Sequence, residues 1–286
     1  MRITKVNRAR SAFGNVTNFL FLALIAAFMV FPLVYIINNA FKPMNELFMY
    51  PPALFVKNPT LENFRNFGSA VGSTVIPISR YLFNSVFITG IGVVGQIGIA
   101  SLAAYFISKH NFYGRNFLME IVVTSLMFTG AVVAIPNYVI MTKMNLINSH
   151  WSIILPAFCS SMGLFLMKQF MDQMIPMTLL EAARIDGAGE LTIFAKIAMP
   201  ICKPAWLTML VFSFQGIWAN TGGTYIFDES LKTLPHALNN IVSNGLVAMQ
   251  GVSAAVALIM IVPPIIVFLI SQSNVLETMA TSGIKD

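Results

Sequence analysis

The chain has 286 residues, of which 57% are hydrophobic and 10% are charged, and its formal net charge is +6. A soluble globular domain carries roughly 25% charged residues, so this chain has too little polar surface to cover a globule in water. The composition therefore excludes an ordinary soluble protein and predicts that lipid surrounds most of the chain. The positive charge does not indicate nucleic-acid binding, because the basic residues are spread along the chain rather than gathered on one face.

Six apolar segments follow one another along the chain, at 17–37, 82–107, 121–141, 151–167, 205–227 and 251–271. Each approaches the roughly 20 residues that a helix needs to cross a hydrocarbon core. We expect helices because a single apolar run can satisfy its own backbone groups in lipid only as a helix, whereas barrel strands are about 10 residues long and alternate in polarity. The sequence therefore predicts one all-α, polytopic membrane domain over residues 1–286 with six transmembrane helices.

The Lys and Arg residues between these segments predict the orientation of the chain. With the N-terminus inside, 11 of the 17 fall on the cytoplasmic side and 6 outside, which agrees with the positive-inside rule. Residues 1–16 are then a basic cytoplasmic tail beside anionic lipid, 38–80 an outer segment and 168–203 a cytoplasmic loop, and the C-terminus is also cytoplasmic. The first apolar segment lacks a convincing small-residue cleavage site, so we do not interpret it as a signal peptide.

Two local patterns predict details of packing. Thr60-Leu61-Glu62 predicts the start of a short outer helix with an acid in its first turn. Small residues spaced along the second apolar segment predict close approach of a neighbouring helix, because they let two backbones meet within lipid. These residues are Gly90, Gly92, Gly95 and Gly98.

The chemistry that the chain lacks narrows its function. It has no Walker loop, no H-E-x-x-H, no G-x-S-x-G and no Cys/His cluster. We expect Cys159 and Cys202 to be buried, unpaired hydrophobes, and the three histidines to be solvated in loops. The six segments hold no Asp, Glu, Lys or Arg, so a proton or sodium relay is not expected. We predict a protein that has no catalytic residue, metal site or cofactor of its own, and that is driven by another subunit.

A polar block interrupts the apolar pattern at Glu181-Ala182-Ala183-Arg184-Ile185-Asp186-Gly187, followed by Ile197-Ala198-Met199-Pro200. Its first residues are good helix formers with an acid at the start, and Gly187 stands where the chain must reverse. Two neighbouring alanines, Ala182 and Ala183, give this helix a slim face that can enter a cleft. Ile197 and Met199 would seat the next helix, which Pro200 begins or bends. We expect a short, rigid cytoplasmic helix that docks onto an aqueous partner.

This spacing resembles the "EAA loop" of permease subunits in bacterial binding-protein-dependent ABC importers, with Met199 where Leu is usual. The resemblance implies a type I importer permease fold of six helices, with a coupling helix that sits in a groove of an ATPase subunit. It implies a coupling role for Glu181, Ala182, Ala183, Arg184, Asp186, Gly187 and Pro200. The implied partners are a second permease subunit in a heterodimer, an ATPase dimer that binds ATP and Mg, and an extracytoplasmic solute-binding protein.

Two further stretches resemble the carbohydrate branch of these importers. Pro51-Pro52 followed by Thr60-Leu61-Glu62-Asn63-Phe64 is similar to the smaller permease of the maltose importer, and the ending 276–286 is similar to permeases of alginate or pectin-derived sugars. The resemblance implies a carbohydrate substrate, with a uronate such as alginate favoured, and a place in the bacterial cytoplasmic (inner) membrane. The tail of the maltose relative contacts its ATPase, but the ending here differs from that tail.

Amide and aromatic side chains within the apolar segments are candidates for the substrate path, because sugars are bound by such groups. The candidates are Asn137, Tyr138, Gln215, Trp218 and Asn220. The alternative for the aromatic residues is the usual enrichment of Trp and Tyr at membrane interfaces. The outer residues 228–232 would either touch the solute-binding protein or form a solvated loop.

Two other functions remain open at this point. The chain could be an ABC permease for a non-sugar solute, such as an amino acid or a polyamine, or a channel or structural membrane protein that works without ATP. Binding assays with the cognate solute-binding protein separate the first alternative from a sugar permease, and co-purification with an ATPase separates the second.

Overall fold

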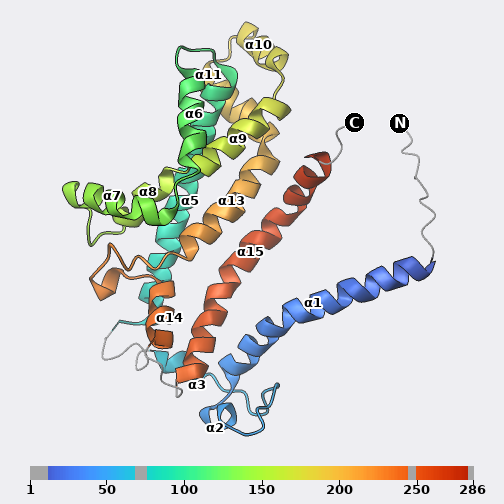
Figure 1. Ribbon diagram of the computed structural model, residues 1–286, viewed down its shortest axis with the longest axis vertical. Helices are drawn as coiled ribbons and strands as arrows, with labels where there is room; N and C mark the ends of the chain where they lie inside the picture. Colours follow the sequence, from blue (N-terminus) through green and yellow to red (C-terminus); the bar gives the residue numbers. More distant parts are fainter. Residues whose placement is uncertain (1–11, 68–75, 244–248, 283–286) are drawn as a thin grey trace. The chain divides into compact units, whose positions relative to one another are not determined.

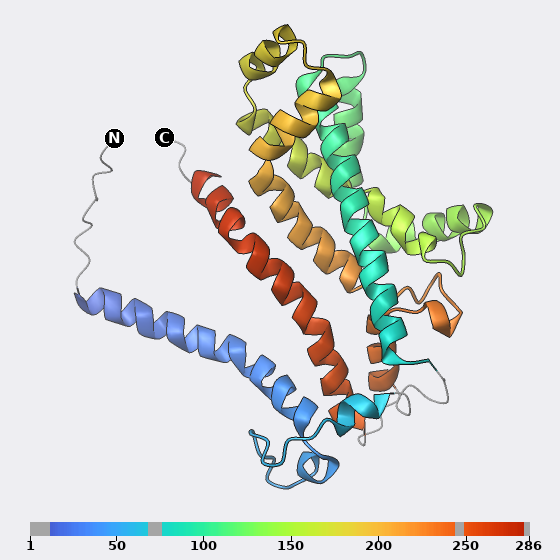
Figure 2. The same ribbon diagram turned by 180° about the vertical axis from the view of Figure 1, so that it is seen from behind.

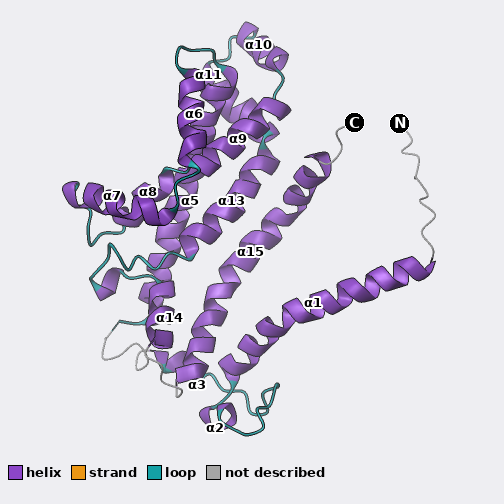
Figure 3. Ribbon diagram, viewed as in Figure 1, coloured by secondary structure: helices purple, strands orange, loops and turns teal. Residues whose placement is uncertain are grey.

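The computed structural model describes residues 12–67, 76–243 and 249–282. Within these ranges the protein consists of helices and loops and has no strand (Figure 3), which confirms the all-α prediction. The chain divides into two compact units, Met1–Asn66 with Leu246–Leu258, and Phe67–Gly245 with Ile259–Asp286. Residues 1–11 of the predicted basic tail and 283–286 of the C-terminal ending lie outside the described residues.

The first unit contains a long apolar helix, α1 (Ala12–Phe41), and two short helices, α2 (Met44–Leu47) and α3 (Glu62–Arg65), as Figure 1 shows. Pro32 lies inside α1 without ending it. The hydroxyl of Thr60 accepts a hydrogen bond from the backbone N–H of Glu62 at 3.2 Å, although Leu61 occupies the N-cap position. The predicted short helix after Thr60 is therefore confirmed.

A buried carboxylate organises the segment between these short helices. The two oxygens of Glu46 accept the backbone N–H groups of Lys57 and Asn58, each at 2.9 Å. The hydrogen bond from Lys57 is the main cause that holds the pKa of Glu46 below its ordinary value. Asn63 is buried as well and donates to the backbone carbonyl of Ala40 at 3.0 Å. Side chains thus satisfy the backbone of a segment that has little regular structure.

The second unit begins with α5 (Ile78–Lys109) and α6 (Arg115–Ser125). Its other helices are α7 (Gly130–Lys143), α8 (Trp151–Phe158), α9 (Ser161–Met174), α10 (Met177–Ile185), α11 (Glu190–Ile193), the π-helical turn η1 (Phe194–Ala198), α12 (Met199–Ile201), α13 (Lys203–Trp218), the 3₁₀ turn η2 (Glu229–Leu231) and α14 (Leu234–Ser243). The last helix, α15 (Gln250–Ser282), has residues in both units.

Helix α5 is central to the second unit and packs against α8, α9 and α13 (Figures 1 and 2). A Cβ atom on Gly92 would lie 3.0 Å from the side chain of Ile217, and one on Gly95 would collide with the ring of Phe158. Close packing at these two glycines is confirmed. Gly90 and Gly98 have no atom within 4 Å of such a Cβ position, so the prediction is wrong for them within the described chain.

Four helical stretches within the described residues are long and apolar enough to cross a membrane: Gly14–Phe41, Ile78–Lys109, Trp151–Met174 and Gln250–Gln272. Two bent pairs of helices reach this length only if each is counted as one span. These are Arg115–Ser125 with Gly130–Lys143, bent by 110°, and Glu190–Ile201 with Lys203–Trp218, bent by 80°. The described residues therefore offer four stretches of sufficient length, or up to six if each bent pair is counted as one span.

The predicted continuous helix over 121–141 is wrong, because the chain turns sharply between α6 and α7. The hydroxyl of Ser125 donates to the carbonyl of Val122 and lies 2.6 Å from the hydroxyl of Ser161. A serine that bonds back to its own helix competes with the helical ladder, which favours an end at this point. The next helix begins at Gly130 after an extended Thr129. Hydropathy reports how apolar a run is and not its direction, so this bend was invisible in the sequence pattern.

The predicted helices over 205–227 and 151–167 also differ from the structure. Helix α13 ends at Trp218, and the chain turns through Gly222, which has a φ of +64°. In the other segment α8 ends at Phe158, and the hydroxyl of Ser160 accepts the N–H of Gly163 at 3.0 Å to start α9. Turn residues end the first of these helices early, and a helix cap starts a new helix within the second, although both segments are apolar.

Candidate functional site

The polar block 181–187 forms the end of α10, which lies at one end of the second unit (Figures 1 and 2). Gly187 has a φ of +82°, and its N–H donates to the carbonyl of Arg184 at 3.0 Å. The N–H of Ala188 donates to the carbonyl of Ala183 at 3.0 Å. These two bonds form a Schellman closure of the helix. No atom lies within 4 Å of a Cβ position on Gly187, so the need for glycine comes from the backbone conformation and not from space.

The two alanines of the motif face opposite ways. Ala182 is exposed, whereas Ala183 is 8% exposed and belongs to the hydrophobic core together with Leu180. The predicted slim face made by both alanines is therefore wrong for Ala183. Glu181 lies in the second turn of α10, which begins at Met177 and has no acid in its first turn, so the predicted dipole contact is wrong too.

The outward side of α10 combines charge with apolar surface. We define the α10 face as Glu181, Ala182, Ile185 and Asp186, all of which are exposed. Ile185 is 86% exposed at the end of the helix. A large apolar side chain held out on a short, firmly closed helix, between two carboxylates, is suited to a contact with another protein.

The downstream flank of α10 is fixed by an ionic cluster around Glu190. Arg184 donates through Nε to Oε1 of Glu190 at 2.7 Å, and the hydroxyl of Tyr105 donates to Oε2 at 2.9 Å. The hydrogen bond with Glu190 raises the pKa of Arg184 above its ordinary value. His110 lies 3.2 Å from Oε2 of Glu190, at the distance of an ion pair but without the angles of a hydrogen bond. The cluster joins the last turn of α5 to the chain that follows α10.

The upstream flank of α10 is held by the same turn of α5. The buried Lys109 donates from Nζ to the backbone carbonyl of Ile175 at 2.7 Å. Ser108 donates to Oδ1 of Asp172 at 2.6 Å, and Lys168 pairs with the other oxygen at 2.6 Å. Sequence reasoning missed Tyr105, Ser108 and Lys109. The polar residues at the end of this apolar run were used only to place the end of a span and to predict its orientation.

The residues after α11 meet the expectation for the start of the next helix. Ile197 and Met199 are partly buried against the core, and Pro200 lies in the short helix α12. The chain then bends by 80° into α13. Cys202 is buried as predicted, but Cys159 is exposed, which corrects the prediction that both cysteines are buried.

A cavity of about 560 Å³ lies among α5, α7, α8, α9 and α13. Its polar lining residues are Gln96, Asn137, Ser152, Ser160, Ser213, Asn220 and Tyr225. None of the lining side chains is charged, and their size and mixed apolar and amide character fit a small-molecule site. The cavity unites two of the five residues predicted for the substrate path, Asn137 and Asn220.

The other three candidates lie outside the cavity lining. Tyr138 stacks on the cavity residue Tyr225, with ring centroids 6.2 Å apart, and so borders the site. Trp218 is 4% exposed and donates from its indole N–H to the carbonyl of Met260 at 3.0 Å. Gln215 is exposed on another side of α13. Trp218 therefore packs within the described part of the protein, and its predicted place on the substrate path stays a prediction.

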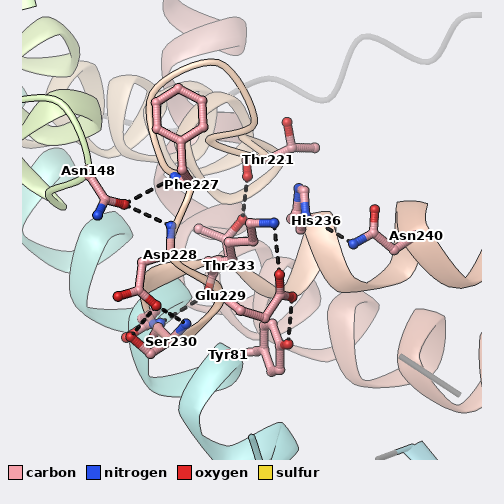
Figure 4. A network of polar contacts seen from close by, with 12 residues as sticks. Tyr81, Asn148, Thr221, Phe227, Asp228, Glu229, Ser230, Thr233, His236 and Asn240 are labelled. Atoms are coloured by element: carbon pink, nitrogen blue, oxygen red, sulfur yellow. Dashed lines mark hydrogen bonds and ion pairs between the residues drawn. The ribbon is translucent and has the colours of Figure 1, made fainter. Parts of the chain in front are cut away.

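The loop after α13 is held by many polar contacts (Figure 4). The side-chain oxygen of Asn148 accepts the N–H groups of Phe227 and Asp228 at 3.1 and 2.8 Å. The hydroxyl of Tyr81 donates to Glu229 at 2.8 Å, and Lys232 pairs with the same carboxylate at 2.8 Å. Phe227 nevertheless remains 61% exposed. The loop is thus a fixed surface with an apolar residue at its edge.

Charge and burial in this loop shift several pKa values. Hydrogen bonds from Ser230 hold the pKa of Asp228 below its ordinary value. Burial acts to raise the pKa of Glu229, but the bonds from Lys232 and Tyr81 outweigh it and lower that pKa. His150 and His236 are partly buried, and burial lowers the pKa of both. The prediction that the histidines are simply solvated is therefore wrong.

Comparison with known proteins assigns the chain. Residues 96–278 match the family described as "Binding-protein-dependent transport system inner membrane component". The chain belongs to this family. The matched residues include α10, its flanks and the whole cavity lining, so the resemblance inferred from the Glu181 motif is confirmed at the level of the family.

Several relatives of this transport component are similar over most of their length. Protein LplC of Bacillus subtilis is 30% identical over 95% of this chain and 94% of its own. The polygalacturonan/rhamnogalacturonan transport system permease protein YtcP of the same organism is 33% identical over 81% of this chain and 78% of its own. The galactooligosaccharides transport system permease protein GanQ, also from B. subtilis, is 28% identical over 94% of each chain.

A solved structure is similar in fold to this transport component. A chain from the crystal structure of a bacterial ABC transporter involved in the import of the acidic polysaccharide alginate matches with a TM-score of 0.78. The match covers 92% of this chain and 98% of that chain at 22% identity. The likeness shows a shared fold. In this chain α10 and the cavity belong to the same compact unit.

Proposed function

We propose that the chain is a permease subunit of a binding-protein-dependent ABC importer for an oligosaccharide. In this proposal the cavity forms part of the substrate path, and the α10 face docks onto a separate ATPase. The subunit would lie in the bacterial inner membrane with both termini cytoplasmic, which puts α10 on the side where ATP is present. It would be a transport subunit that catalyses no reaction itself.

The observation that carries the coupling role is the construction of α10. Its exposed face includes an isoleucine that is 86% exposed, while the helix is closed by Gly187 and tied to α5 on both flanks. A helix held in a fixed position suits the docking of a partner onto its exposed face. Glu181, Ala182, Ile185 and Asp186 would contact the ATPase, and Ala183, Arg184, Gly187 and Pro200 would hold their positions.

The partners follow from the family and from this geometry. Two ATPase subunits would bind ATP and Mg, and a second permease subunit would complete the path. A solute-binding protein would contact the outer surface that includes Phe227 and residues 228–232. A solved relative of low identity, the bacterial alginate ABC transporter, was captured in complex with an alginate pentasaccharide-bound periplasmic protein, which makes such an assembly reasonable here.

A carbohydrate substrate is supported by the relatives and by the cavity. GanQ and the arabinooligosaccharides permease AraQ of Bacillus subtilis carry sugar substrates in their names and align over most of this chain. The cavity offers amides at Gln96, Asn137 and Asn220 and an aromatic ring at Tyr225, which suit hydroxyl-rich ligands.

An acidic sugar is a more specific form of the proposal. YtcP, whose name includes polygalacturonan, is 33% identical to this chain. However, no lining residue of the cavity is a cation. The second permease subunit or the solute-binding protein would therefore have to supply the positive charge that binds a uronate.

Docking can be tested by co-purification with the partner permease and the ATPase, together with ATP-dependent uptake of galactotriose or trigalacturonate. Ile185→Asp should remove the ATPase and abolish uptake, because it buries a new carboxylate beside Glu181 and Asp186. Thr192→Asp is the matched control, since Thr192 is exposed on the neighbouring helix α11 but lies outside the α10 face.

Normal ATPase retention and uptake by the Ile185→Asp variant would contradict the coupling role. Uptake without any bound ATPase would instead favour an ATP-independent channel. Preference for trigalacturonate over galactotriose would support the acidic form of the proposal, and the reverse preference would exclude it.

A further inference from the structure

Helix α5 is continuous where several of its neighbours are broken or bent. It runs for 32 residues without a proline, whereas α6 and α7 bend by 110° and the chain bends by 80° before α13. Gly92 and Gly95 pack tightly against α13 and α8 in its middle, and Gln96 reaches the cavity. A continuous, closely packed helix without proline is suited to move as one body rather than by internal bending.

The first turns of α5 hold the outer loop. Asn84 is fully buried and donates from its amide to the carbonyls of Ser230 and Lys232, both at 2.9 Å. Tyr81 donates to Glu229 at 2.8 Å (Figure 4), and Ser85 accepts the N–H of Leu234 at 2.8 Å. The loop partners lie almost 150 residues further along the chain, so these contacts are purely tertiary.

The last turn of α5 holds both flanks of α10. Tyr105 donates to Glu190 after α10, and Lys109 donates to the carbonyl of Ile175 before it. Tyr81 and Tyr105 lie about 36 Å apart along the helix axis, given a rise of roughly 1.5 Å per residue. One continuous helix is therefore bonded to both flanks of α10 at one end and to the outer loop at the other, and it lines the cavity between them.

We propose that α5 links the position of α10 to the position of the outer loop, and that Tyr81, Asn84, Tyr105 and Lys109 are the positioning residues of this link. The inference rests on the proposed function, in which α10 meets an ATPase and the outer loop meets a solute-binding protein. Displacement of α10 when the ATPase closes pulls the last turn of α5. The same movement shifts Gln96 in the cavity and the loop that faces the binding protein.

The test uses the whole importer in proteoliposomes, with the solute-binding protein present and with whichever trisaccharide the wild type takes up. ATP hydrolysis and uptake are measured together for wild type, Tyr81→Phe, Tyr105→Phe and the double variant. Each single change removes one hydrogen bond to a carboxylate and keeps the ring. We expect a fall of about tenfold in the uptake per ATP hydrolysed.

The double variant gives the decisive result. If both residues act in one link, it should lose no more than the worse single variant, whereas independent structural damage at such a distance would add. Tyr113→Phe is the matched control, because Tyr113 is fully exposed beyond the end of α5 and should behave as wild type. If a tyrosine variant fails to assemble, Asn84→Ala and Lys109→Met provide the same comparison, with the exposed Lys143→Met as control.

The proposed link would be overturned if the losses of uptake per ATP in the two single variants added up in the double variant. It would also be overturned if each single variant showed the same uptake per ATP as the wild type. Failure of the proposed function is a separate outcome. In that case the wild-type chain itself would neither retain an ATPase nor show uptake that depends on ATP.

Discussion

The α10 segment and the cavity are two candidate sites built in different ways. The α10 segment is local, since one stretch of chain supplies the exposed face, the glycine closure and Glu190, and only the anchors on α5 come from elsewhere. The cavity takes its lining residues from five helices and from the loop that follows α13. A local site leaves a readable motif, whereas an assembled one does not. The difference also predicts that substitutions which change the backbone conformation will impair the α10 segment. Substitutions of single side chains will instead impair the cavity.

The largest effect is expected at the closure of α10. Gly187→Pro imposes a φ near −65° where the structure has +82° and removes the N–H that bonds to Arg184, at a cost of about 3 kcal/mol or more. We expect loss of ATPase binding and uptake with normal membrane insertion, measured by co-purification and membrane fractionation. Gly189→Ala is the control, because Gly189 has a φ of −72° and open space around it. Uptake at the wild-type level by the proline variant would exclude a coupling role for this turn.

A smaller effect is expected where α5 packs against α8. Gly95→Ala places a methyl group against Phe158 and should lower stability by about 1–3 kcal/mol. Gly98→Ala, on the same helix with open space, should leave stability nearly unchanged. Thermal unfolding of the two purified variants in the same detergent measures the difference. Equal melting temperatures would mean that α5 and α8 separate more easily than their packing indicates.

Side-chain changes within the cavity should act on transport and leave docking intact. Asn137→Ala removes one potential hydrogen bond to the sugar and should raise the KM for uptake about fivefold to tenfold. Gln215→Ala is matched to it, since Gln215 carries the same kind of amide outside the lining. ATPase retention should be normal in both variants. A larger effect from Gln215 than from Asn137 would move the substrate path to another side of α13.

The smallest effect concerns pH and the outer loop. The pKa values of Asp228 and Glu229 lie below the ordinary 3.8 and 4.5, so their contribution is present at neutral pH and is lost as pH falls through the lowered values. Hydrogen exchange of amides 227–234, corrected for intrinsic rates, should be about fivefold faster at pH 3 than at pH 7. The amides of α7, which has no acidic residue, serve as the internal control. Unchanged protection of the loop would mean that Asn148 and the α5 contacts are sufficient.

Prediction from the sequence succeeded where a short stretch of chain carries its own physical reason. The Glu181 motif predicted a helix that ends at Gly187, because a glycine with positive φ closes such a helix without help from the rest of the fold. It also indicated the family that the comparisons establish. It failed for Ala183, which sits beside an exposed alanine but is turned into the core by the helical period of α10.

Composition alone determined that the chain is helical and apolar, since 57% hydrophobic residues arranged in long runs leave a helix as the structure that lipid allows. Only the tertiary structure decided that 121–141 bends, that Trp218 packs inside, and that Asn137 and Asn220 meet at one cavity. It also decided that the two ends of α5 hold two distant loops. The physical reason is that hydropathy indicates whether a segment lies in lipid or in water. The bends and contacts of a segment depend instead on residues far away in the chain.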